Sequence, residues 1–327
     1  MATESIPESL LQQLRSGQRF LLTSHANPDG DAVGSEIGLA RLLGKLGKAT
    51  AIWNRDPAPR AYSALPGIQR IHVGEEPPPG FPDAFDAVVV LECSSLDRTG
   101  LEEPLKALPA LNIDHHLGNE RYGVVNWVDT KAPAVGAMVY RLAGALRVTV
   151  DKETANSLYL TLVTDTGGFR YSNTTAEAFQ SAAALVDAGA SPETVTRWLF
   201  ESQPESALRL LGEMLQTLEL HLDGRVATAW LTRDMIERCG ARPGDSEGLI
   251  DYPRSIAGVD AVALFRQLDN GDFKVSLRSR GHHDVEKMAR RFGGGGHQNA
   301  AGFSSQVSRD RLLEETLAAL AEILEPA

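Results

Sequence analysis

The first half of the chain alternates short, fully apolar runs with helical patterns. The runs lie in the segments RFLLTSH, KATAIWN, FDAVVVLE and ALNIDHH, and VGSEIGLARLLGKLG supplies a helical pattern between the first two. Runs that are apolar throughout indicate strands covered on both faces, and helices between them indicate parallel crossovers. We therefore predict an α/β fold, with a doubly wound and mostly parallel sheet in its N-terminal part.

Polar residues follow directly after three of these predicted strands. His25, Glu92 and Asp114 each stand where a strand ends. In open α/β sheets, ligands bind beyond the carboxyl ends of the strands. We expect these three side chains to converge on one edge of the sheet.

The second half of the chain indicates a separate, smaller α+β domain. Residues 130–218 have a mainly helical pattern. Beyond them, VATAWLT, VDAVALFRQL and FKVSLRSR predict strands, and the turn signal DNG at 269–271 joins the last two in a hairpin. A chain of 327 residues is expected to form two domains. We place them at 1–200 and 201–327, with linker helices before the second core.

Charge and hydropathy limit the kinds of partner that the chain can bind. A net charge of -11 argues against binding long duplex nucleic acid through a broad basic face. Residues 264–297 nevertheless carry seven basic side chains against four acidic ones, which suits a small anionic substrate. No apolar run has the length of a membrane span, and the N-terminus lacks the pattern of an export signal, so we expect a cytoplasmic protein with no membrane partner.

The segment HANPDGD gathers His25, Asp29 and Asp31 within seven positions. Two carboxylates this close repel each other when ionised, and burying them without a positive partner is costly. A metal ion would supply that charge. The alternative is a turn at NPDG with Asp31 capping the following helix, and this stretch alone does not decide between the two.

Two further clusters extend the pattern. In NIDHHLG, His115 and His116 project differently, so one can bind a metal while the other faces substrate, and Asp114 can orient one ring. In VTDTGGFRYSNT, Asp165 follows a helical pattern, and the polar residues after it can bind phosphate: Arg170, Ser172, Asn173 and Thr174. Standing alone, the first cluster would be a polar loop and the second a helix end. Taken together with Glu92, the clusters favour a shared functional site over separate structural roles.

Further candidates for binding an anionic substrate lie outside the predicted ligands. In GGGGHQNAAG, an anion-binding concavity can be formed by Gly294, Gly295, Gly296 and His297. Arg278 and Arg280 alternate on the preceding predicted strand and therefore face the same side. A flexible loop and a solvated strand face are the alternatives, but the combination favours a pocket for a terminal phosphate or the last nucleotide. For Arg98, in LDRTG, we favour an ion pair over a place beside the metals.

In this order, the motifs resemble those of the DHH phosphoesterase family, whose members include RecJ-type exonucleases, manganese-dependent inorganic pyrophosphatases and nanoRNase/pAp phosphatases. HANPDGDAVGS resembles the first motif, Asp114-His115-His116 the one that names the family, and TDTGGFRYSNT the fourth. FGGGGHQNAAG resembles the signature of the DHH-associated domain, so the resemblance spans nearly the whole chain. Glu92 departs from the pattern, because the family has a metal-bridging aspartate there.

The resemblance implies a centre of two divalent ions. Oxygen and imidazole ligands favour Mn²⁺, with Mg²⁺ or Co²⁺ as other options. The family pattern assigns the ligands as follows: His25 and Asp29 to one ion, Asp31, His115 and Asp165 to the other, and Glu92 to both. A hydroxide bridging the ions would attack phosphorus. His116, with Asp114, would contact the scissile phosphate or assist the leaving oxygen.

The resemblance also implies a substrate class. It points to an enzyme that degrades short RNA oligonucleotides to mononucleotides and removes phosphate from pAp, with catalysis in 1–200 and substrate binding in 201–327. A phosphodiesterase acting on pApA or cyclic di-AMP is the alternative within the family. A non-catalytic nucleotide-binding regulator is the alternative from another class. The oligomeric state is left open, with a homodimer as one option.

Overall fold

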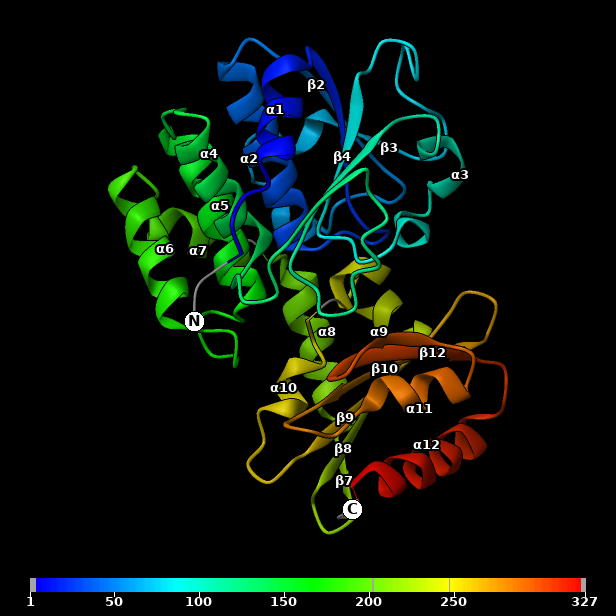
Figure 1. Cartoon of the computed structure of the whole chain (residues 1–327). Helices are drawn as coiled ribbons and strands as arrows, with labels where there is room; N and C mark the ends of the chain where they lie inside the picture. Colours follow the sequence, from blue (N-terminus) through cyan, green and yellow to red (C-terminus); the bar gives the residue numbers. More distant parts are fainter. Residues whose placement is uncertain (1–3, 202, 247, 325–327) are drawn as a thin grey trace. The chain divides into compact units, whose positions relative to one another are not determined.

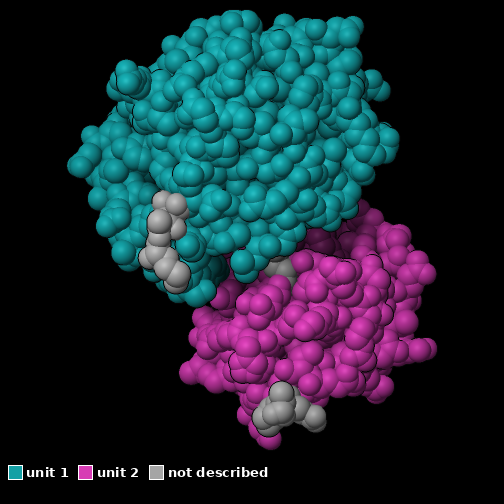
Figure 2. Space-filling view, viewed as in Figure 1, with its two compact units in different colours: residues 1–202 teal, residues 203–327 magenta. Residues whose placement is uncertain are grey.

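The chain forms two compact units. A computed structural model describes residues 4–201, 203–246 and 248–324. The chain divides into unit 1, residues 1–202, and unit 2, residues 203–327, which Figure 2 draws in different colours. Each unit has its own sheet and its own core. This division lies two residues beyond the boundary that we placed between residues 200 and 201.

The sheet of unit 1, as far as the chain is described, has six parallel strands in the order β3-β2-β1-β4-β5-β6 (Figure 1). The strands are β1 (Arg19–Thr23), β2 (Ala49–Asn54), β3 (Ile71–Val73), β4 (Ala87–Leu91), β5 (Ala110–Asp114) and β6 (Val125–Val128). The order reverses its direction between β1 and β4, which is where ligands bind in such sheets. The predicted doubly wound parallel sheet is confirmed.

Burial on both faces explains why the strands are apolar throughout. In β4, Val89 and Leu91 belong to the core on one face of the sheet, whereas Val88 and Val90 belong to the core on the other. All four side chains are fully buried. The first polar residue that follows, Glu92, therefore comes directly after the strand, and it is there that the candidate site lies.

Helices cover the sheet of unit 1, and residues 130–218 are mainly helical, as predicted. The helices of unit 1 are α1 (Glu8–Ser16), α2 (Gly30–Lys45), α3 (Glu102–Leu105), α4 (Val135–Ala145), α5 (Lys152–Asp165), α6 (Ala176–Asp187) and α7 (Pro192–Phe200). Short 3-10 turns lie at η1 (Arg60–Tyr62), η2 (Ile68–Arg70) and η3 (Leu96–Thr99). Among the described residues, no helix is both long and apolar enough to cross a membrane.

Unit 2 contains a mixed sheet in the order β11-β12-β10-β9-β8-β7. Its strands are β7 (Glu219–His221), β8 (Val226–Leu231), β9 (Ala261–Gln267), β10 (Phe273–Ser279), β11 (Gly295–His297) and β12 (Ala300–Ser305). Its helical elements are α8 (Glu205–Leu215), α9 (Arg233–Arg238), η4 (Pro243–Ser246), α10 (Asp251–Arg254), α11 (Val285–Arg291) and α12 (Arg309–Leu324). The predicted hairpin is confirmed, because β9 and β10 pair antiparallel across the turn at 269–271.

Candidate metal centre

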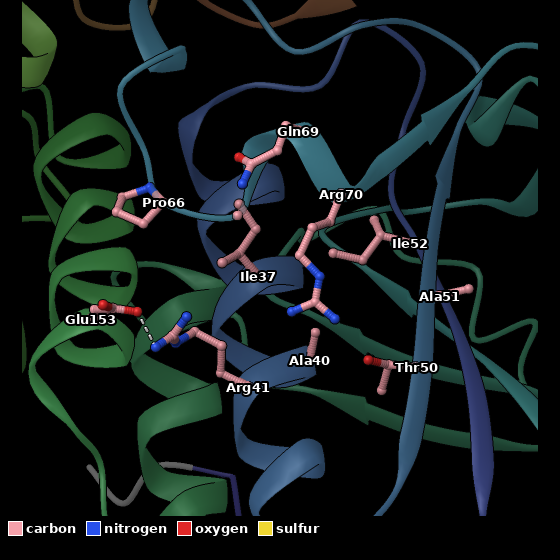
Figure 3. A pocket seen from close by; sticks show the side chains of 11 residues that line it. Ile37, Ala40, Arg41, Thr50, Ala51, Ile52, Pro66, Gln69, Arg70 and Glu153 are labelled. Carbon is pink, nitrogen blue, oxygen red and sulfur yellow. Dashed lines mark hydrogen bonds and ion pairs between the residues drawn. The ribbon is translucent and has the colours of Figure 1, made fainter.

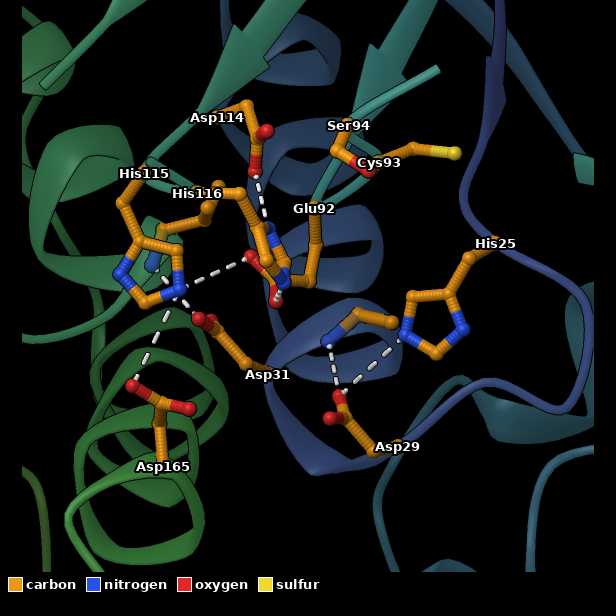
Figure 4. Close-up of polar contacts among 12 residues, drawn as sticks. His25, Asp29, Asp31, Glu92, Cys93, Ser94, Asp114, His115, His116 and Asp165 are labelled. Atoms are coloured by element: carbon orange, nitrogen blue, oxygen red, sulfur yellow. Dashed lines mark hydrogen bonds and ion pairs between the residues drawn. The ribbon is translucent and has the colours of Figure 1, made fainter. Parts of the chain in front are cut away.

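Histidines and carboxylates lie together at the carboxyl ends of three neighbouring strands of the unit 1 sheet, β1, β4 and β5 (Figure 4). His25 lies two residues beyond β1, and Glu92 directly follows β4. Asp114 is the last residue of β5, and His115 comes next. Because these strands are parallel and adjacent, their carboxyl ends place the side chains together.

Helix packing brings further carboxylates to the same edge. Asp31 lies in the first turn of α2, and Asp165 is the last residue of α5. The two helices pack closely at Gly34, where a Cβ atom would fall 2.6 Å from Thr161 Cγ2. A glycine is needed for that approach. The start of α2 therefore lies against the end of α5, as Figure 4 shows for the two carboxylates.

Glu92 points its buried carboxylate at two histidines. Its Oε1 lies 3.6 Å from His116 Nε2, and its Oε2 lies 3.3 Å from His115 Nε2. The backbone of Glu92 has a φ of 53° in the left-handed region, which a residue with a side chain adopts at an energetic cost. The backbone is therefore strained at the residue whose carboxylate points toward the two histidines.

His115 presents one ring nitrogen to the acidic cluster. Its Nδ1 lies 3.0 Å from the Ala132 carbonyl oxygen, so Nδ1 carries the proton and donates it there. The other nitrogen, Nε2, lies between Glu92 and Asp165, 3.9 Å from Asp165 Oδ2. A backbone carbonyl on one ring nitrogen is the usual way to fix a metal-binding histidine.

Asp31 is fully buried and is held by the start of another helix. Its Oδ2 accepts the backbone N–H of Val135 at 2.6 Å, and its Oδ1 accepts that of Gly136 at 3.1 Å. Asp29, rather than Asp31, caps α2, with Oδ1 accepting the Ala32 N–H at 3.0 Å. The alternative interpretation of Asp31 as the cap of its own helix is therefore wrong.

His25 and Asp29 form the outer part of the cluster. His25 Nε2 lies 4.0 Å from Asp29 Oδ1, and His25 Nδ1 lies 2.8 Å from the Ala26 carbonyl oxygen. If Nδ1 donates to that carbonyl, Nε2 is left to accept or to bind a cation. Figure 4 shows the two side chains directed toward each other.

His116 is oriented by a carboxylate that is itself held in place. Its Nδ1 donates to Asp114 Oδ1 at 2.8 Å. Asn119 donates from Nδ2 to Asp114 Oδ2 at 2.6 Å, so both carboxylate oxygens of this buried aspartate have a donor. Nε2 of His116 is left directed at Glu92.

The electrostatics of the cluster are those of crowded negative charge. Burial raises the pKa of Asp31 well above its usual range, and the charges of Glu92 and Asp165 raise it further. Burial also raises the pKa of Asp165 to about 7. Burial opposes the charged forms of His115 and Glu92, but their mutual attraction prevails, so the pKa of His115 is raised and that of Glu92 lowered. A divalent cation would replace the protons that this cluster otherwise holds.

The donors include candidate ligands for a divalent ion. Two groups of three side chains have ligand atoms within 4.8 Å of one another: Glu92, His115 and His116, and Asp31, His115 and Asp165. Both groups contain His115, and because its Nδ1 is engaged by the Ala132 carbonyl, its Nε2 can bind one ion; neither group includes His25 or Asp29. The second group equals the ligand set that the family pattern assigns to one ion. The first contains His116, which the sequence analysis treats as a catalytic group.

The groups that hold these ligands were not identified from the sequence. They include the carbonyl of Ala132, the amides at the start of α4, and Asn119. Asn173, predicted to bind phosphate, donates from Nδ2 to Asp165 Oδ2 at 2.9 Å and so orients a ligand. Arg170 and Ser172 are exposed nearby, with Arg170 Nε donating to the Gly167 carbonyl oxygen at 2.6 Å.

In unit 2, the segments proposed to bind phosphate lie in and beside the mixed sheet. The glycine-rich segment pairs as strand β11 with β12 instead of forming a loop, and Gly294 lies so close to Gly302 that a Cβ atom would fall 2.1 Å from its carbonyl oxygen. Strand β10 ends at Ser279, so Arg280 lies one residue beyond the strand that was predicted to hold it. Arg278 lies within β10. The side chain of His297 is outside the described part of the chain.

A separate cavity of about 240 Å³ lies in unit 1 between α2, β2 and η2. Figure 3 shows the side chains of Arg41 and Arg70, which come from α2 and η2, beside Ile37 and Ile52 in the lining of this cavity. Arg41 forms an ion pair with Glu153. None of the predicted site residues lines this cavity, so it is distinct from the metal centre.

Comparison with known proteins assigns both units. The model described as the DHH family, N-terminal domain, matches residues 19–163, and the model described as the DHHA1 domain matches residues 223–325. The chain is 35% identical over 305 residues to the bifunctional oligoribonuclease and PAP phosphatase of Thermus thermophilus, covering 93% of this chain and 89% of that protein. The chain belongs to the DHH family of phosphoesterases.

Solved structures share the fold of this DHH protein. An exopolyphosphatase-related protein from Bacteroides fragilis superposes with a TM-score of 0.90 at 27% identity, covering 96% of this chain and 95% of that one. The exonuclease RecJ bound to manganese superposes with a TM-score of 0.54 at 15% identity, covering 98% and 94%. The DHH protein therefore has the two-unit fold of its relatives, and its candidate ligands lie at one edge of the N-terminal sheet.

Proposed function

We propose that this DHH phosphoesterase hydrolyses short oligoribonucleotides to mononucleotides and removes phosphate from pAp, with two divalent cations, Mn²⁺ foremost. The observation that carries the proposal is the pair of candidate ligand groups that share His115 in one mostly buried cluster. The Thermus relative supports the substrate class, because it is named for both activities and aligns over 89% of its length.

The residues of the chain would divide between holding cations and handling protons. In this proposal Asp31, His115 and Asp165 hold one cation, His25 and Asp29 hold the other, and Glu92 binds both. Such a pair of cations supplies an activated water and offsets charge on the phosphoryl oxygens. The longer side chain of Glu92 suits a bridging role because its two oxygens already face different histidines.

His116 is the candidate proton donor to the leaving oxygen. Burial lowers its pKa, but the hydrogen bond to Asp114 and the charge of Glu92 outweigh burial and raise it. A raised pKa lets the ring carry a proton near neutral pH, where general acid catalysis is most effective. Asp114 would then stabilise the imidazolium and keep its Nε2 turned toward the cluster.

Unit 2 is the proposed holder of the substrate end. Arg278 supplies a cationic group that suits a terminal phosphate, and it pairs with Ala300, near the end of the glycine-rich segment at 292–302. The local excess of basic residues on an acidic chain supports this assignment.

A parallel assay tests the proposal. The Mn²⁺-loaded protein is incubated with an RNA pentamer, a long RNA, pAp, cyclic di-AMP and pyrophosphate, and the products are separated. We expect the pentamer and pAp to be turned over at least about tenfold faster than the others, and chelation with EDTA to stop turnover until Mn²⁺ is restored. Preferential cleavage of cyclic di-AMP would replace the proposal by a dinucleotide phosphodiesterase. A protein that binds Mn²⁺ and nucleotides without turnover would be a binding regulator.

A further inference from the structure

Arg98 is fixed beside the metal centre by its backbone. It lies in the turn η3, which begins four residues after Glu92. Its carbonyl oxygen accepts the N–H of Ala26, the residue after His25, at 2.7 Å. The turn is thereby tied to two strand ends that carry candidate ligands.

The side chain of Arg98 stays close to the same strand end. Its Nη1 donates to Ser94 Oγ at 3.0 Å, and Ser94 lies two residues beyond Glu92. The guanidinium group therefore lies near the residues that directly follow Glu92.

Arg98 differs from the other half-buried arginines that the structure describes in unit 1, because no carboxylate pairs with it. Arg41, Arg55 and Arg141 pair with Glu153, Glu75 and Asp129, respectively. Arg98 is half-buried but forms no ion pair with any described residue, so the ion pair expected from the sequence is not found. A guanidinium group offers five N–H donors, and burying part of it without an anion is unfavourable. An oxyanion from outside the chain would offset that cost.

We propose that Arg98 binds a phosphate group of the substrate at the edge of the metal centre. The proposal rests on the proposed function, because it assumes a phosphorylated substrate at this edge. The carboxylates of the centre are engaged by histidines, by backbone N–H groups and, when loaded, by cations. The charge of Arg98 is then available for an incoming phosphate, which its planar fork can bind through two hydrogen bonds.

Steady-state kinetics of Arg98→Ala and Arg98→Lys test this role. With pAp as substrate, we expect Arg98→Ala to raise KM about ten- to hundredfold and to change kcat by less than about threefold. Arg98→Lys should recover part of the loss, because it keeps the charge without the fork. Arg55→Ala is the matched control, since Arg55 packs against Gly100 at the end of the same turn but already pairs with Glu75 at 2.7 Å.

A binding measurement separates this proposal from the proposed function. Titration calorimetry of AMP into the Mn²⁺-loaded wild type and variants needs no turnover. Weaker AMP binding by Arg98→Ala, with Mn²⁺ content and melting temperature unchanged, supports the proposal even if no tested substrate is hydrolysed. Equal KM and equal AMP affinity in wild type and Arg98→Ala would overturn it, as would an equal loss in Arg55→Ala.

Discussion

Asp31 accepts the backbone N–H of Val135 at 2.6 Å, across 104 residues of sequence. Val135 is the first residue of α4, where unpaired N–H groups give the helix end a partial positive charge. One carboxylate therefore joins α2 to α4 and belongs to a group of candidate metal ligands. Structural and ligand roles are combined in the same side chain.

Asp31→Asn is expected to lose both roles. The side-chain oxygen of asparagine can accept only one of the N–H groups of Val135 and Gly136, its amide nitrogen cannot accept the other, and the neutral side chain attracts a cation less strongly. We expect Mn²⁺ affinity to fall at least about tenfold, turnover to be abolished and stability to fall by about 1–3 kcal/mol. Calorimetry and denaturant unfolding measure these effects.

Asp151→Asn is the matched control, because Asp151 caps α5 by accepting the Thr154 N–H at 2.9 Å on the exposed side of the unit. It should lose stability and keep Mn²⁺ affinity. Normal turnover in Asp31→Asn would remove Asp31 from the site.

His115→Ala should disturb both candidate ligand groups, because His115 is common to them. We expect bound Mn²⁺ to fall from two ions to one or none, and kcat to fall by about a thousandfold or more. Metal analysis after gel filtration and single-turnover assays give the two numbers. His72→Ala, at an exposed histidine bonded to the Glu76 carbonyl oxygen, should change neither. Two tightly bound ions in His115→Ala would contradict the assignment.

Glu92→Asp tests the unusual residue at the bridging position. The shorter side chain withdraws the carboxylate from both histidines, but it restores the residue that the DHH pattern has there. We expect activity within about tenfold of the wild type and a changed ratio of Mn²⁺- to Mg²⁺-supported rates. Rates measured with each ion in turn provide the check. Complete inactivation with normal folding would show that this site needs the longer arm.

We expect the stability of the folded protein to depend on pH through Glu36, which is not one of the candidate metal ligands. It is fully buried, and burial raises its pKa to about 7 although the hydrogen bond from Asn54 Nδ2 at 2.9 Å lowers it. The folded state thus holds a proton that the unfolded state releases near pH 4.3. The stability contributed by this proton is complete below the unfolded pKa and is lost as pH rises to about 7.

Glu36→Gln should abolish that loss. In metal-free protein, we expect the free energy of unfolding of Glu36→Gln minus that of the wild type to increase by about 2–3 kcal/mol from pH 5 to pH 8. Urea unfolding at the two pH values measures the difference. Glu103→Gln, at an exposed glutamate, is the control and should show no such improvement. An equal offset at both pH values for Glu36→Gln would contradict the buried titration.

The sheet and the convergence of strand ends follow from local sequence. Residues such as Val88 and Val89 must both be buried although they face opposite sides, so a fully apolar run identifies a central parallel strand. The polar residue after such a run is then placed at the sheet edge by topology alone. This reasoning places His25, Glu92 and Asp114 at one edge without any knowledge of side-chain geometry.

The interactions that hold the ligands could not be predicted in the same way. The carbonyl of Ala132 and the amide of Val135 are backbone groups, which every residue carries, so no residue type marks them. The residue type does not predict the left-handed backbone of Glu92 either, because glutamate rarely adopts that conformation. Only the folded chain shows which of Asp29 and Asp31 caps α2, because both have the residue type that capping favours.

The most direct test of the central claim is anomalous diffraction from crystals of this protein soaked in Mn²⁺. The account predicts two peaks about 3.5–4 Å apart, one bound by Asp31, His115 and Asp165 and both in contact with Glu92. A cluster that stays empty in a fully soaked crystal, or peaks that lie away from these side chains, would contradict it.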